Sequence, residues 1–226
     1  MDRRLLVLIV AAVALIGVVN ATAFAYRWIT GKINIAGPDQ ATGAACTGFY
    51  SSADQPDILG YLPPAGTNYN APTYGNNKIE VTPRNPVCQW TNTTSNNQVQ
   101  LYEDIEVNIS VTVGSWYIQD FYGFGYYNGT GPVYVWFRLE IPATGGGNLT
   151  TAKLVIYKVD SNGTVTYVNE LNLTESTGTL VSARSLNPGE AFRLDLRLDA
   201  ASAGTVSFKV GVYVSQENEA PISPTP

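Results

Sequence analysis

The residues best suited to acid–base chemistry in this chain are carboxylates, because the sequence contains no histidine. Glu103, Asp104 and Glu106 lie close together in the sequence, and glycosidases usually use two carboxylates as their catalytic residues. The surrounding residues alternate as in a β-strand, so Glu103 and Asp104 point to opposite faces of a sheet. An acidic stripe that faces solvent explains this cluster better than a catalytic pair. The sequence also lacks a nucleophile elbow and a Walker loop, and we expect no enzyme activity.

No cofactor or metal is expected, since histidine is the commonest metal ligand in proteins. Residues 160–163, Asp-Ser-Asn-Gly, resemble the opening of a calcium loop, but the later acidic ligands are missing. Asn-Gly is a strong hairpin signal. We therefore interpret this segment as a turn between two strands.

Aromatic side chains are the next candidates for function, and they gather between Trp116 and Phe137. Trp136 is expected in the core. A glycine-rich tip is expected to expose four residues to solvent: Tyr122, Phe124, Tyr126 and Tyr127. An exposed aromatic row can form a contact with another subunit or stack on sugars. The subunit contact is the preferred interpretation, and sugar binding is the alternative.

Two further features suit a chain that leaves the cell. Cys46 and Cys88 are predicted to form a structural disulfide. The sequence also contains six Asn-x-Ser/Thr motifs, which are candidate N-glycosylation sites: Asn92, Asn108, Asn128, Asn148, Asn162 and Asn172. A strand protein rich in threonine and asparagine also produces such motifs by chance.

An export signal is predicted at residues 1–25. Arg3 and Arg4 precede an apolar helical run over residues 5–19, and Ala-x-Ala cut sites follow, with cleavage expected after Ala25. An uncleaved signal anchor and a type IV pilin leader are the alternatives. The protein is therefore expected to be secreted, touching a membrane only before cleavage. Its formal net charge of −5 argues against a nucleic-acid partner.

β-Strands must position all of these residues, because no helical period is sustained after the signal. Short alternating segments with turn signals between them predict an all-β sandwich or jelly roll over residues 36–215. Residues 36–77 are rich in glycine and proline and predict a long loop insertion that the disulfide ties to the body. Residues 216–226 are predicted to be a flexible, proline-rich tail.

Two segments carry a resemblance to a known family. Residues 26–31, Tyr-Arg-Trp-Ile-Thr-Gly, follow the alanine-rich cut site directly, and residues 186–190, Leu-Asn-Pro-Gly-Glu, precede a strand of alternating apolar residues. In both respects the chain resembles secreted β-sandwiches of the TasA/camelysin type, most of all the archaeal bundling pilins. The insertion at residues 36–77 departs from the shorter TasA pattern.

This resemblance implies a structural subunit of an extracellular filament or pilus in a bundle or biofilm matrix. Residues 26–35 would be a donor strand that completes the sheet of the next copy, head to tail. Ile29, Ile33 and Ile35 would fill its pockets, Gly31 would allow close approach, and Tyr26 and Trp28 would anchor the strand. Neighbouring filaments and cell-surface glycans are further implied partners.

Three alternatives remain open. Residues 26–35 can instead form the first strand of their own sandwich. The domain can also be a carbohydrate-binding or adhesive module of the cell surface, or part of an S-layer or another anchored surface protein.

Overall fold

The computed structural model describes residues 45–66, 79–145 and 149–220. By its internal contacts the chain divides into two units, residues 1–35 and 36–226, and every described residue belongs to the second. The expected signal peptide, the expected donor strand at residues 26–35, and the Asn148 motif lie outside the described residues.

Antiparallel β-strands account for most of the described residues. They are β1 (Cys46–Tyr50), β2 (Ile79–Thr91), β3 (Gln98–Val111), β4 (Gly114–Asn128), β5 (Val133–Gly145), β6 (Leu149–Val159), β7 (Val165–Asn172), β8 (Leu180–Leu186), β9 (Ala191–Ala200) and β10 (Gly204–Ser215), with one 3₁₀ turn, η1 (Pro56–Ile58). Within these ranges no helix has the length and apolar character to cross a bilayer.

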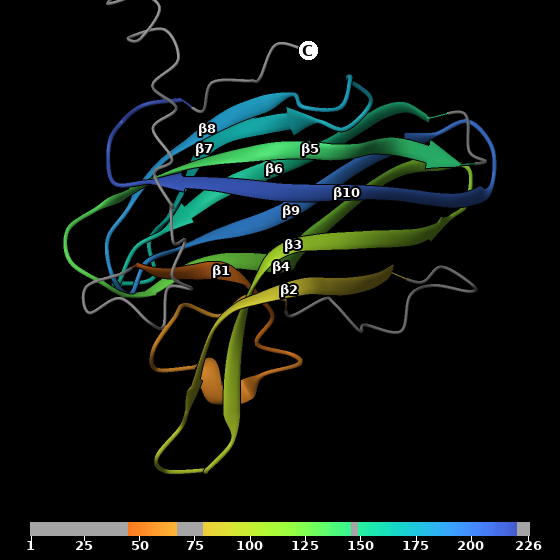
Figure 1. Cartoon of the computed structure of the whole chain (residues 1–226). Helices are drawn as coiled ribbons and strands as arrows, with labels where there is room; N and C mark the ends of the chain where they lie inside the picture. Colours follow the sequence, from red (N-terminus) through yellow and green to blue (C-terminus); the bar gives the residue numbers. More distant parts are fainter. Residues whose placement is uncertain (1–44, 67–78, 146–148, 221–226) are drawn as a thin grey trace, which may run out of the picture. The chain divides into compact units, whose positions relative to one another are not determined.

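The strands form one continuous sheet in the order β7-β6-β9-β4-β1-β3-β10-β5-β8, and β2 adds to β3 outside this path. Figure 1 shows the sheet folded over, so that β7 and β8 lie side by side although they are at opposite ends of the order. The Asn169 amide joins these ends by donating to the Ser182 carbonyl oxygen at 3.0 Å. The expected all-β sandwich is confirmed, with β1 as the strand that connects its two layers.

Alternating apolar residues fill the space between the layers. On β9, Phe192, Leu194, Leu196 and Leu198 are all fully buried, and β10 contributes Val206, Phe208 and Val210 to the same core. Each such side chain stabilises the fold by about 1.5–3 kcal/mol relative to its exposed state. Trp136 is 6% exposed, as the sequence predicted.

The predicted loop insertion contains a strand that sequence reasoning missed. β1 lies within residues 36–77 and pairs with both β3 and β4. Its five residues are too few for a clear alternation, but Phe49 is fully buried and meets the edges of Phe124 and Phe137, at centroid distances of 5.3 and 6.0 Å. The sequence predicts two short strands at residues 78–82 and 87–91, but from Ile79 onward, where the structure describes them, they are one strand, β2.

The predicted aromatic tip is wrong, because β4 continues through Gly123 and Gly125 instead of turning there. A Cβ on Gly123 would lie 2.4 Å from the Cβ of Ala65, and one on Gly125 would lie 2.6 Å from a methyl group of Leu62. The glycines therefore let residues 51–66 pack closely against β4.

The four tip residues are not exposed, because Tyr122, Phe124 and Tyr126 point into the main core and Tyr127 packs against the smaller one. Tyr122, Phe124 and Tyr126 are almost completely buried, and Tyr127 is half-buried. The interpretation of these residues as an exposed contact row is therefore corrected.

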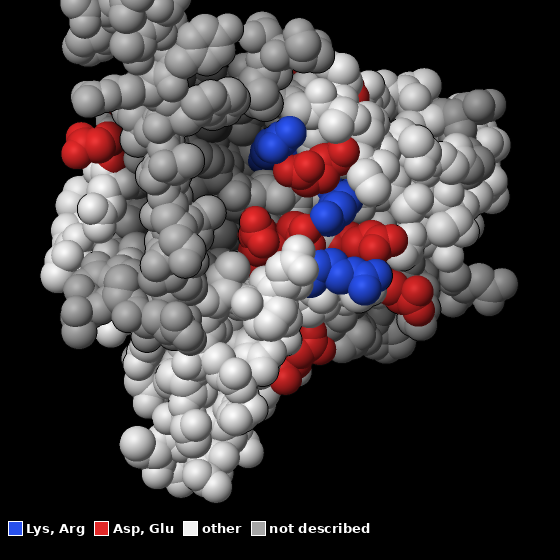
Figure 2. Space-filling model, viewed as in Figure 1, with Lys and Arg blue, Asp and Glu red and all other residues white. Residues whose placement is uncertain are grey.

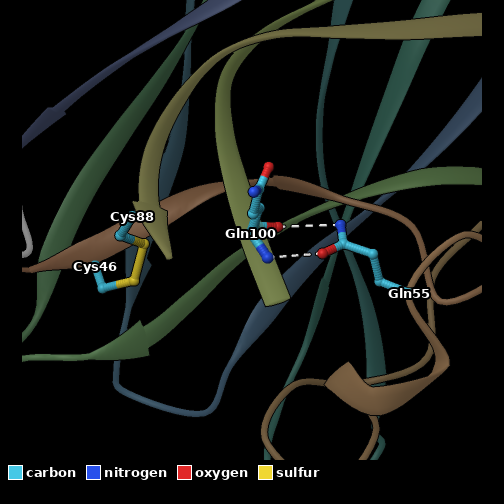
Figure 3. Close-up of a disulfide and its surroundings, with 4 residues drawn as sticks. All are labelled: Cys46, Gln55, Cys88 and Gln100. Atoms are coloured by element: carbon cyan, nitrogen blue, oxygen red, sulfur yellow. Dashed lines mark hydrogen bonds between the residues drawn. A yellow bond between two sulfur atoms is a disulfide. The ribbon is translucent and has the colours of Figure 1, made fainter. Parts of the chain in front are cut away.

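Residues 51–66 build a second, smaller core against β2 and β3. Tyr50, Ile58 and Leu62 are buried there, and the predicted Cys46–Cys88 disulfide is confirmed beside them. Figure 3 shows the disulfide together with Gln55, whose side chain exchanges two hydrogen bonds with the backbone of Gln100, at 2.7 and 3.0 Å.

The disulfide should contribute measurably to stability. Because it closes a segment with a sequence separation of 42, its loss should lower the free energy of unfolding by roughly 4 kcal/mol on the chain-entropy estimate. Chemical denaturation of the Cys46→Ala/Cys88→Ala variant and of wild type, each with and without reductant, measures this. Equal stability of oxidised wild type and the variant would contradict it.

Candidate functional site

Two of the three acidic residues that the sequence singled out form ion pairs on the outer face of β3. Asp104 pairs with Lys209 at 2.6 Å, and Glu106 pairs with Arg84 at 3.0 Å. Figure 2 shows basic and acidic side chains interleaved over β2, β3 and β10. A carboxylate held by a cation in this way serves structure. The predicted solvent-facing stripe is wrong for Asp104, which is buried beside Lys209.

The segment with calcium-loop character is the expected hairpin turn between β6 and β7. One carboxylate oxygen of Asp160 accepts hydrogen bonds from the backbone N–H groups of Asn162 and Thr164, at 2.9 and 2.8 Å. Among the described stretches of the chain, no group of three or more acidic or cysteine side chains is arranged to hold a metal.

The glycosylation motifs differ in how their asparagines are engaged. Asn128 is exposed at the end of β4 and Asn162 is exposed in a turn, while Asn108 is half-buried within β3. The side chains of Asn92 and Asn172 accept backbone hydrogen bonds from Thr94 and Thr174, at 2.9 and 3.1 Å.

The strongest candidate site is a group of tyrosines on the outer face of β4, β9, β6 and β7. We call it the tyrosine face; it comprises Tyr117, Tyr157, Tyr167, Arg193 and Asp195. Tyr117 and Tyr167 are 54% and 52% exposed, among the most exposed large side chains of the described residues. The strand register places Arg193, Tyr157 and Tyr167 in one row across β9, β6 and β7.

Asp195 is the centre of this face. Its side chain is fully buried, yet both oxygens are satisfied. The Tyr117 hydroxyl donates to one oxygen at 2.6 Å, and the backbone N–H of Asp120 donates to the other at 2.8 Å. A buried carboxylate needs such partners to remain charged. Tyr117 is thereby held in one orientation with its ring open to solvent.

Arg193 connects the carboxylate with the other tyrosines. Its guanidinium donates to Asp195 at 3.1 and 3.2 Å and lies 4.7 Å from the centre of the Tyr157 ring. Tyr157 meets Tyr167 edge-on at 5.9 Å and shares a hydroxyl contact of 3.1 Å with Tyr117. These contacts join all five side chains into one rigid network.

The disulfide-tied segment forms a wall beside the tyrosine face. Ala65 packs over Gly123, which is the partner of Arg193 in the β4–β9 register. The backbone N–H of Gly66 donates to the Asp120 carboxylate at 3.2 Å. The backbone N–H of Asp120 in turn donates to the Asp195 carboxylate. The face is therefore bounded on the β4 side by residues from the insertion.

Sequence reasoning missed this face for two physical reasons. Tyr117, Tyr157 and Tyr167 are far apart in the chain, and only the antiparallel register brings them together. Asp195 belongs to an alternating Arg/Asp pattern that predicts a solvated strand face, whereas it is fully buried. The alternation correctly predicted the direction of these side chains but not what covers them.

A second aromatic group lies on the smaller core, at Tyr61, Trp90 and Tyr127. Trp90 and Tyr127 are stacked in parallel with centroids 3.8 Å apart, and Tyr61 meets both rings edge-on. Each of the two stacked rings covers one face of the other, so this arrangement mainly stabilises the packing of the smaller core.

Comparisons with known proteins identify no family for the chain. No family model matches it, and no curated protein matches it. A solved structure of TmCBM61 in complex with β-1,4-galactotriose is similar at a TM-score of 0.31 and 16% identity, covering 70% of this chain and 98% of that one. A similarity this low carries no weight for function.

Two tyrosines with raised pKa values, Tyr117 and Tyr50, predict a loss of stability at alkaline pH. Burial and the hydrogen bond to Asp195 raise the pKa of Tyr117, and burial raises that of Tyr50, whose hydroxyl donates to the Pro63 carbonyl at 2.6 Å. Unfolded tyrosines ionise near pH 10. The stability that these phenols supply is thus complete below about pH 10 and is lost as the pH rises further.

Melting temperatures between pH 8 and pH 12 test this, with Tyr50→Phe as the matched variant. The melting temperature of wild type should fall above about pH 10, and that of the variant should fall less steeply. Parallel curves for the two proteins would contradict the assignment.

Proposed function

We propose that this domain is an extracellular carbohydrate-binding or adhesive module that binds a saccharide on its tyrosine face without catalysing a reaction. The observation that carries the proposal is the orientation of Tyr117, whose hydroxyl is fixed by buried Asp195 while its ring remains 54% exposed.

The chemistry of the face suits a sugar. Saccharides present apolar C–H faces that pack on aromatic rings, and hydroxyl groups that take part in hydrogen bonds. Binding sites typically combine aromatic surface with a few fixed polar groups. Tyr117 and Tyr167 supply exposed rings, and the Arg193 guanidinium and the tyrosine hydroxyls supply the polar groups.

Rigidity favours the same function. Because Tyr117, Tyr157, Arg193 and Asp195 already bond to one another, a ligand would not have to order them. A preorganised surface keeps more of its contact energy as affinity.

Replacing Tyr117 tests whether its ring binds the saccharide. Tyr117→Ala removes the ring and should weaken saccharide binding about tenfold, on the scale of 1.4 kcal/mol per tenfold change. Tyr117→Phe keeps the ring and should weaken binding less. Affinity electrophoresis against β-galactan, xylan, β-glucan, polygalacturonate and chitosan, followed by calorimetry, measures this.

Tyr213→Ala is the matched control, since Tyr213 is 40% exposed but lies on β10 in the other layer. It should leave binding unchanged. If Tyr213→Ala and Tyr117→Ala reduce binding equally, the tyrosine face is not the site.

We propose a second candidate function, a subunit of an extracellular filament, for which residues 26–35 would be the donor strand. The sequence resemblance to the TasA/camelysin type, carried by residues 26–31 and 186–190, supports it. A strand added to a neighbouring sheet gains main-chain hydrogen bonds and fills pockets with alternate side chains. Both functions are compatible with secretion and with an adhesive role.

Deletion of residues 26–35 tests the filament candidate. The secreted wild-type protein should form fibres under the electron microscope, and the deletion variant should remain monomeric in sedimentation experiments while still binding saccharide. Monomeric wild-type protein at high concentration would remove the filament candidate and leave the saccharide site unaffected.

A further inference from the structure

We infer that the tyrosine face takes an acidic saccharide, one that carries a carboxylate such as a uronic acid, and that Arg197 is the residue that binds this carboxylate. The inference rests on the proposed carbohydrate-binding function and specifies its ligand class.

The strand register places Arg197 directly beside the exposed tyrosine. Arg197 on β9 is the partner of Tyr117 on β4 and of Lys153 on β6. It shares the outer side of β9 with Arg193 and Asp195, because side chains alternate along a strand. Its own side chain is exposed. A sugar ring on Tyr117 would therefore lie next to a guanidinium.

The neighbouring cations of this layer are already paired. Arg193 binds Asp195 at 3.1 Å, Lys153 binds Glu170, and Lys158 binds Glu190 at 2.7 Å. Within the described part of the chain, Arg197 has no hydrogen bond or ion pair of this kind. Among the described cations of this layer, Arg197 is therefore the one without such a partner, and its donors are available to a ligand.

The nearest acid on the same strand has partners of its own. Asp199 accepts hydrogen bonds from the hydroxyls of Ser115 and Thr151, which lower its pKa, and the charge of Arg197 adds a smaller effect. The attraction between Arg197 and Asp199 is thus one between exposed groups, which is weak in water.

Arginine is well matched to this task. Its planar guanidinium can donate two parallel hydrogen bonds to one carboxylate, and such charge-assisted pairs are stronger than bonds between neutral groups. A neutral sugar would gain the stacking on Tyr117 and Tyr167 but not this pair. The face should therefore distinguish saccharides by charge as well as by shape.

Calorimetry with matched ligands tests the inference. The probes are oligomers of galacturonate, mannuronate and glucuronate, each beside its methyl ester, which removes the charge and leaves the ring unchanged. At least one acid should bind wild type about tenfold more tightly than its ester. Arg197→Gln should abolish this preference, and raised salt should reduce it.

A matched control is Arg184→Gln, an exposed arginine on β8 in the other layer, which should leave the preference intact. If wild type binds esters or neutral saccharides as tightly as the acids, the inference about charge is overturned while carbohydrate binding stands. If it binds no saccharide at all, the proposed function fails as well. A preference that survives Arg197→Gln would overturn the role of Arg197.

Discussion

The buried carboxylate of Asp195 is the interaction on which this side of the molecule depends. A charge at a fully buried position is costly unless donors surround it, and here the donors are Tyr117, Arg193 and the backbone of Asp120. Each donor brings a different part of the chain to the same point. Tyr117 precedes the register shift of β4, Asp120 lies within it, and Arg193 belongs to β9. The carboxylate therefore holds the register shift of β4 against β9.

The same part of β4 also positions the inserted segment, residues 51–66. Asp120 binds the backbone of Gly66, and Gly123 and Gly125 leave room for Ala65 and Leu62. The disulfide then holds β1, which directly precedes this segment, against β2. Stability and function are linked through this arrangement, because the wall beside the tyrosine face belongs to the smaller core. The outer face of the opposite layer also carries interleaved ion pairs (Figure 2).

Much of this fold follows from sequence patterns. Alternation on β9 and β10 predicted strands with one apolar face, the cysteines predicted their own pairing, and Asn162-Gly163 predicted a turn. β1 could not be predicted, because five residues within a segment rich in glycine and proline show no period. The glycines of β4 suggested a turn, but their role is close packing, which depends on a partner segment remote in sequence. The tyrosine face was hidden for the same reason, as its members meet only across strands.

The central claim, that the tyrosine face binds a saccharide, is tested most directly by NMR of protein labelled with ¹³C in its tyrosine rings. Titration with the tightest saccharide of the panel should shift the ring signals of Tyr117, Tyr157 and Tyr167 and leave that of Tyr213 unchanged. Shifts confined to Tyr61 and Tyr127, or no shift at saturating saccharide, would contradict the account.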